Sequence, residues 1–172
     1  MTDRIRLDRW TVTSGSNVVS RAAVVLNAGS HDWQASAEGT GAVDALFRAV
    51  DTALRDVLGG SPLLLGYDVH ALAEGPDAEG GVTVRIAPPP SAEGGRSDGR
   101  FTGEAASVNT IAASVEAYVE ALNAMLASEA WTGAARAAGD ARGDAQAEAE
   151  TEPASTEFDA QADVDAMEWF NR

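Results

Sequence analysis

Few residues in this sequence have the types and spacing that catalysis requires. Only two histidines occur, His31 and His70, in segments that alternate like strands. Neither belongs to a His-x-His or HExxH pattern, and no nucleophile elbow is present. Cysteine is absent, which removes thiolate nucleophiles and thiolate metal ligands. The sequence therefore predicts no catalytic residue, no metal site and no cofactor.

Carboxylates are abundant, so their presence alone indicates little. Asp44 and Asp51 have the spacing of a solvated helix face, and we interpret them in that way. Among the acidic residues we find no pair with a defined acid–base role.

Two small-residue turns are the only repeated special feature. Gly39-Thr40-Gly41 and Gly103-Glu104-Ala105-Ala106 each stand between an expected strand and an expected helix. Small residues let a ligand approach the backbone, and a helix N-terminus offers free N–H groups to an anion such as a carboxylate. The alternative is a tight turn with close strand–helix packing. Spacing alone leaves both interpretations open.

Hydrophobic periodicity indicates the elements around these turns. Alternation predicts three strands, then a helix that starts at an N-cap Thr40 and ends at Gly59-Gly60. The same order follows again, with an exposed Pro/Gly/Ser loop over 88–99 before the last strand. The expected strands are 5–14, 18–28, 31–37, 63–72, 81–87 and 100–102, and the second helix begins near Val108 and reaches Leu126.

The second half can be laid over the first, which predicts a duplication. We expect an α+β, two-layer fold of two βββα units, about 5–58 and 62–127, related by a pseudo-twofold within a domain of residues 1–128. The matched segments are Trp10–Ser14 with Tyr67–Ala71, Ala22–Leu26 with Val82–Ile86, and Gly39–Gly41 with Gly103–Ala105.

Charge and hydropathy restrict the partners. The 172 residues carry a net charge of −15, and all 12 basic residues are arginine. Such a surface repels phosphate backbones, so we expect no nucleic-acid partner. No apolar run approaches the ~20 residues of a membrane span, and no signal peptide is evident at the N-terminus. We expect a cytoplasmic protein with no membrane partner.

Residues 129–172 have a different composition from the rest. This acidic, low-complexity segment is predicted to be a disordered tail. Near its end, Val164, Met167, Trp169 and Phe170 could share one face of a short helix. That face is either a docking motif or a set of incidental apolar residues.

Three stretches together resemble a known family. They are residues 37–50 around the first turn, residues 66–80, and residues 112–123 of the second helix. The combination looks like the C-terminal regulatory domain of 2-isopropylmalate synthases and citramalate synthases. The resemblance covers about residues 5–127.

The resemblance implies a dimer-forming domain of two βββα units that binds an end-product amino acid, such as leucine, near the turns that open the helices. Small side chains there would leave room for an aliphatic ligand. The positions that match the family's binding turns are Gly39, Gly41, Ala42 and Val43 in the first unit and Gly103, Ala105, Ala106 and Ser107 in the second.

The sequence departs from the family pattern in three ways. The catalytic barrel with its metal-binding histidine pair does not precede the domain, Ala105 replaces the second glycine of the second turn, and the acidic tail has no counterpart. We therefore expect a stand-alone, non-catalytic amino-acid sensor linked to branched-chain amino-acid biosynthesis. The alternatives are a dimerisation scaffold without a ligand and the regulatory subunit of a split synthase with a separate catalytic subunit.

Overall fold

The computed structural model describes residues 4–90 and 99–128, which form six strands and three helices. The predicted boundary at residue 128 stays a prediction, because the acidic tail and its terminal segment lie outside the described residues. The elements are β1 (Arg6–Gly15), β2 (Val18–Ala28), β3 (His31–Gly39), α1 (Ala42–Ala53), α2 (Arg55–Leu58), β4 (Leu63–Ala71), β5 (Gly80–Ala87), β6 (Phe101–Ser107) and α3 (Thr110–Leu126).

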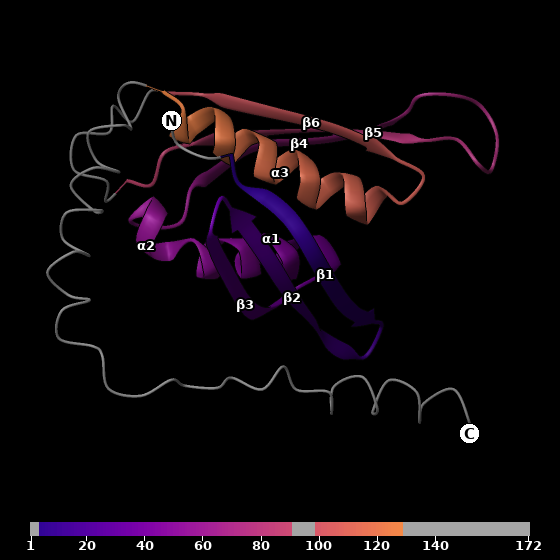
Figure 1. Ribbon diagram of the computed structural model, residues 1–172. Coiled ribbons are helices and arrows are strands. Elements are labelled where there is room, and N and C mark those ends of the chain that lie inside the picture. Colours follow the sequence, from indigo (N-terminus) through magenta and orange to yellow (C-terminus); the bar gives the residue numbers. More distant parts are fainter. Residues whose placement is uncertain (1–3, 91–98, 129–172) are drawn as a thin grey trace, which may run out of the picture. The chain divides into compact units, whose positions relative to one another are not determined.

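Two separate antiparallel sheets form, each with one long helix on one face. The strand order is β1-β2-β3 in the first sheet and β4-β5-β6 in the second. Figure 1 shows α1 beside the first sheet and α3 beside the second, and the two helices also contact each other. The expected α+β fold of two βββα repeats is confirmed. We call β1 to α2 the first repeat and β4 to α3 the second.

The strand registers show how closely the two repeats correspond. In both repeats the first strand has an irregularity at the same place, between Leu7 and Arg9 and between Leu64 and Gly66. The predicted overlays of the first and second strands are confirmed, since the corresponding residues have corresponding partners. The matching pairs are Leu7–Leu26 with Leu64–Ile86, Trp10–Val24 with Tyr67–Val84, and Val12–Ala22 with Val69–Val82.

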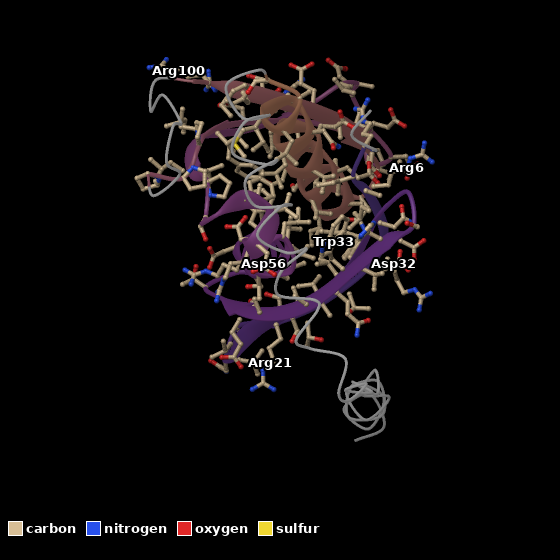
Figure 2. All side chains as sticks on the ribbon, turned by 60° about the vertical axis from the view of Figure 1, so that its left-hand side comes forward. Arg6, Arg21, Asp32, Trp33, Asp56 and Arg100 are labelled. Carbon is tan, nitrogen blue, oxygen red and sulfur yellow. The ribbon has the colours of Figure 1, made fainter. Side chains whose placement is uncertain are left out.

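The core lies between the sheets and their helices. Alternate residues of the middle strands point inward, as period-two patterning requires. They meet the apolar stripes of α1 and α3, which carry Leu46, Val50, Val115 and Leu122. Charged side chains such as Arg6, Arg21 and Arg100 instead project outward from the ribbon (Figure 2).

Three details differ from the sequence predictions. The first helix is broken at Leu54 (φ −100°, ψ 12°), and α2 continues to the left-handed Gly59 that ends it. The last strand extends from Phe101 to Ser107, and its helix starts only at Thr110. Pro88 and Pro89, expected in an exposed loop, are buried.

The helix α3 also holds the start of the first repeat. The side chain of Asn123 accepts a hydrogen bond from the Ile5 N–H at 2.9 Å and donates one to the Ile5 carbonyl at 2.8 Å. Arg4 forms an ion pair with Glu120 on the same helix. The two residues just before β1 are therefore bound to the second repeat.

No helix in the described part of the chain is long and apolar enough to cross a membrane.

Candidate functional site

The turn between β3 and α1 presents backbone donors that have no acceptor within the helix. Gly41 is the N-cap residue, with extended backbone (φ −157°, ψ 172°) and no side chain to cap the helix. Its carbonyl accepts the first helical hydrogen bond, from the Ala45 N–H at 2.9 Å. The N–H groups of Ala42, Val43 and Asp44 precede that bond and have no intrahelical acceptor. They point out of the helix end that carries partial positive charge.

The two glycines of this turn have different surroundings. A Cβ added to Gly39 would lie 2.5 Å from the Ala45 nitrogen and 2.6 Å from Asp44 Oδ2, so Gly39 is required for close packing. A Cβ added to Gly41 would meet nothing within 4 Å. The space in front of the α1 N-terminus is therefore open on the Gly41 side.

Asp44 supplies the charge at this turn. Its Oδ2 accepts a hydrogen bond from the Thr40 N–H at 2.9 Å, and its carboxylate pairs with Arg48 at 3.0 Å. The Thr40 hydrogen bond and then Arg48 hold the pKa of Asp44 below its usual range, although partial desolvation opposes them. The predicted N-cap role of Thr40 is wrong, because Gly41 occupies that position and Thr40 donates to Asp44 instead.

In the equivalent turn of the second repeat, a side chain caps the start of the helix. The N-cap residue of α3 is Asn109, whose Oδ1 accepts hydrogen bonds from the Ile111 and Ala112 N–H groups at 3.0 and 3.3 Å. The Asn109 N–H in turn donates to Ser107 Oγ at 3.1 Å. This helix start therefore has fewer donors left for a ligand than that of α1.

The predicted overlay of the two turns is wrong by four residues. Ser20 pairs with Gly39 at the end of the first sheet, and Gly80 pairs with Ser107 at the end of the second. Ser107 therefore corresponds to Gly39, and Asn109 corresponds to Gly41. Gly103, Ala105 and Ala106 lie within β6, not at a turn.

Gly103 has a packing role that its sequence context concealed. It is buried, and a Cβ there would overlap the backbone of Ala117 and Ala121 in α3. The small residue lets the strand and the helix approach closely, which was the alternative interpretation of the turns.

The structure therefore brings together only part of the predicted site. Gly39, Gly41, Ala42 and Val43 lie at one strand-to-helix turn, and Ser107 lies at the other. Whether any of these residues binds an amino acid stays a prediction.

A half-buried carboxyl between the helices was missed by sequence reasoning. Asp51 of α1 accepts a hydrogen bond from the Tyr118 hydroxyl of α3 at 2.5 Å. Burial raises the pKa of Asp51 to about 6, against smaller opposing effects of Tyr118, Ser61 and Arg48. Burial beside this carboxyl also raises the pKa of Tyr118. The interpretation of Asp51 as part of a solvated helix face did not anticipate this hydrogen bond, because Tyr118 lies 67 residues away in the sequence.

The described residues provide little for catalysis. Within 4–90 and 99–128, no group of three or more His, Asp or Glu side chains is arranged to hold a metal ion. His31 stacks on Trp33 with ring centroids 6.0 Å apart, and His70 is exposed on β4.

Known proteins have sequences similar to that of this chain. The chain is 36% identical over 125 residues to a 2-isopropylmalate synthase from Nitrosococcus oceani, covering 72% of this chain and 22% of the relative. It is 38% identical over 122 residues to a 2-isopropylmalate synthase from Thiobacillus denitrificans, covering 70% and 21%. The chain thus spans about a fifth of the length of these relatives.

The family model that matches covers residues 1–126 and describes the LeuA allosteric (dimerisation) domain. This range includes both βββα repeats and all described elements. The resemblance seen in the sequence is thereby confirmed, and the chain belongs to the LeuA allosteric (dimerisation) domain family.

Proposed function

We propose that this chain is a non-catalytic, amino-acid-sensing domain that regulates a 2-isopropylmalate-synthase-type barrel in leucine biosynthesis. The barrel acts either within the same polypeptide or as a separate subunit. The ligand is leucine or a related branched-chain amino acid, bound at the turn that opens α1. One observation carries the choice of site: the start of α1 is uncapped, and the space beside Gly41 is open.

The chemistry of that turn fits an α-amino acid. The N–H groups of Ala42 and Val43 would hold the ligand's carboxylate, because a helix N-terminus favours negative charge. Asp44 supplies a carboxylate at the same turn that would face the ligand's ammonium group. The small side chains of Gly41 and Ala42 leave room for an aliphatic group.

Calorimetric titration with leucine, isoleucine, valine and lysine tests the sensing function. We expect at least one branched-chain amino acid to bind and to raise the free energy of unfolding by about 2.7 kcal/mol at a hundredfold excess over Kd. No heat and no thermal shift with any of them at millimolar concentration would remove the sensing function.

The position of the ligand is tested by filling the open space. Gly41→Trp should abolish amino-acid binding without unfolding the protein, because the backbone there is extended and nothing lies within 4 Å. The matched control is Val108→Trp, at the position one residue before the other N-cap, where the native side chain is 64% exposed. Loss of binding in the control alone would place the ligand at the α3 turn.

We further propose that the domain forms a homodimer through the inward side of β4. Leu64, Tyr67 and Val69 lie on the side of the sheet that α3 covers, yet they are 52%, 38% and 48% exposed. We call these three residues the β4 face. An edge strand with exposed apolar side chains fits an interface, and the family is named for dimerisation.

A charge placed on the β4 face tests the dimer. Leu64→Asp should convert the protein to a monomer in light scattering during size-exclusion chromatography. Val108→Asp adds the same charge at another exposed apolar residue and should leave the dimer intact. A Leu64→Asp variant that is still dimeric would place the interface elsewhere.

A further inference from the structure

Tyr67 is the aromatic residue of the β4 face, and contacts within its own chain hold it in place. Its hydroxyl lies 2.7 Å from Ser114 Oγ on α3. Its ring meets Phe47 of α1 edge-on, with centroids 6.1 Å apart and an interplanar angle of 83°. Aromatic pairs of this geometry are attractive and specific in direction. Tyr67 is therefore held by both long helices, although 38% of its surface stays exposed.

The hydrogen bond between Tyr67 and Ser114 has a defined direction. Ser114 Oγ donates to the Thr110 carbonyl at 2.5 Å, which uses its one proton. The Tyr67 hydroxyl must therefore donate to Ser114. Because Ser114 already has an acceptor within its own helix, it does not need Tyr67 to be satisfied. The bond between the two hydroxyl groups therefore serves mainly to orient the Tyr67 ring.

The first repeat has apolar or aromatic residues at the two equivalent positions. Counted from the N-cap residues of the two long helices, Ser114 of α3 corresponds to Leu46 of α1. By strand register, Tyr67 corresponds to Trp10. Leu46 is buried, and Trp10 is partly buried against the core. The hydroxyl pair thus belongs to the repeat whose first strand is exposed.

Ser114 is too deeply buried to contact a second copy. Its exposed fraction is 1%, whereas that of Tyr67 is 38%. A partner that covers the β4 face would contact Tyr67 but not Ser114. In a protein that remains folded, an effect of Ser114 on the dimer must therefore pass through Tyr67.

The position of Tyr67 suits the centre of an interface. The strand register places it between Leu64 and Val69 on the same side of β4. Tyrosine is enriched among the residues that contribute most to the affinity of protein interfaces. Ordering a side chain during association costs part of the binding free energy, so a tyrosine that is already fixed binds more tightly.

We propose that Tyr67 is the anchor of the dimer interface and that Ser114 is a positioning residue, which fixes Tyr67 in its binding orientation before a second copy arrives. The choice of a second copy as the partner rests on the proposed function. The fixing of Tyr67 does not, because its contacts lie within one chain. In a symmetric dimer each copy contributes one Tyr67, so the effect of Ser114 counts twice.

The first test measures the dissociation constant of the dimer by sedimentation equilibrium. Ser114→Ala should raise this constant roughly tenfold, because both Tyr67 side chains must then be ordered on association. The matched control is Ser20→Ala, because Ser20 is also a buried serine (2% exposed) and bonds to Ser14 in the first repeat. The control should leave the constant unchanged. Circular dichroism checks that both variants are folded. Equal constants in the wild type and Ser114→Ala would overturn the role of Ser114.

A double-mutant cycle isolates the hydrogen bond between Tyr67 and Ser114. Tyr67→Phe keeps the ring and its edge-on contact with Phe47 but removes the donor of this bond. Adding Ser114→Ala to Tyr67→Phe should not weaken the dimer further, because the bond is already absent. If the two effects multiply in the double variant, Ser114 acts by another route and the proposal is wrong.

The last test examines whether Ser114 fixes Tyr67 in the absence of a dimer. In the Leu64→Asp variant, NMR should show one side-chain rotamer of Tyr67 and nuclear Overhauser effects between its ring and that of Phe47. Adding Ser114→Ala should average the rotamers and weaken these effects. A Tyr67 side chain that is equally ordered with and without Ser114→Ala would overturn the inference.

Failure of the proposed dimer would be recognised separately. A wild-type chain that is monomeric, or a Leu64→Asp variant that is still dimeric, would exclude the proposed interface and with it the anchor role of Tyr67. The NMR comparison would still decide whether Ser114 fixes Tyr67, since that contact lies within one chain. A dimer that Leu64→Asp disrupts and Ser114→Ala leaves unchanged would instead retain the interface and exclude the positioning role.

Discussion

The strands β1 and β4 occupy the same position in their repeats, yet one is covered and the other is open. Leu7, Trp10 and Val12 of β1 are partly buried against the core. The corresponding residues of β4, Leu64, Tyr67 and Val69, are among the most exposed apolar side chains described. The two repeats therefore have the same strand pairing, but the corresponding side chains of their first strands differ in burial.

The long helices contact the two strands unequally, since β1 contacts both α1 and α3. At 1.5 Å per residue, the 17 residues of α3 extend about 26 Å, and the 12 residues of α1 extend about 18 Å. The long helix reaches across to β1 and binds Ile5 through Asn123. The short helix ends at Ala53, and Phe47 is its aromatic contact with β4. In the proposed dimer, a second copy would cover the open strand β4.

The largest expected difference concerns two glycines that look alike in the sequence. Gly103→Ala should lower the free energy of unfolding by about 3 kcal/mol or more, because the new Cβ overlaps the α3 backbone. Gly41→Ala should change it by less than about 0.5 kcal/mol, since its surroundings are open. Urea denaturation measures both. Equal losses would show that the two positions are packed alike.

A smaller difference is expected between the covered and the open strand. Leu7→Ala should cost about 1–2 kcal/mol of stability at any protein concentration, because it removes partly buried core contacts. Leu64→Ala should cost under about 0.5 kcal/mol in dilute solution, where the chain is monomeric. At high concentration its cost should grow with the population of dimer. A cost for Leu64→Ala that is independent of concentration would argue that the β4 face is not an interface.

The smallest expected effects come from exchanging the caps of the two helices. Asn109→Ala should lose about 1 kcal/mol, because the Ile111 and Ala112 N–H groups lose their acceptor. Gly41→Asn should gain only a few tenths of a kcal/mol, yet it should weaken amino-acid binding by occupying the α1 donors. Thermal unfolding and calorimetry measure the two quantities. Unchanged affinity in Gly41→Asn would argue against α1 as the binding turn.

The fold was largely predictable because the strand signals are local. Alternation identified five strands closely, and the overlay of Tyr67–Ala71 on Trp10–Ser14 proved correct to the residue. The third strand of the second repeat was predicted four residues too short. Gly103 looked like a turn residue, although its small size serves strand–helix packing. Asn109 before an apolar-periodic segment was the signal that would have located the turn correctly.

The site was less predictable because its decisive properties are not local. Nothing in the sequence distinguishes Gly41, which faces open space, from Gly39, which is enclosed by Asp44 and Ala45. The hydrogen-bond partner of Asp51 is Tyr118, 67 residues away. The spacing of residues along the sequence predicts on which side of α1 Asp51 lies. Only tertiary packing determines which residues of the other elements contact that side.

The bond between Asn123 and Ile5 joins residues 118 positions apart, and this separation affects how the domain opens. We expect these hydrogen bonds to form only after both repeats have assembled. Closing so long a loop costs conformational entropy that the contacts within one repeat do not offset. The Ile5 amide should therefore exchange its hydrogen only when α3 separates from β1, not when the chain end frays. A single backbone proton would then report the rate at which the two halves part.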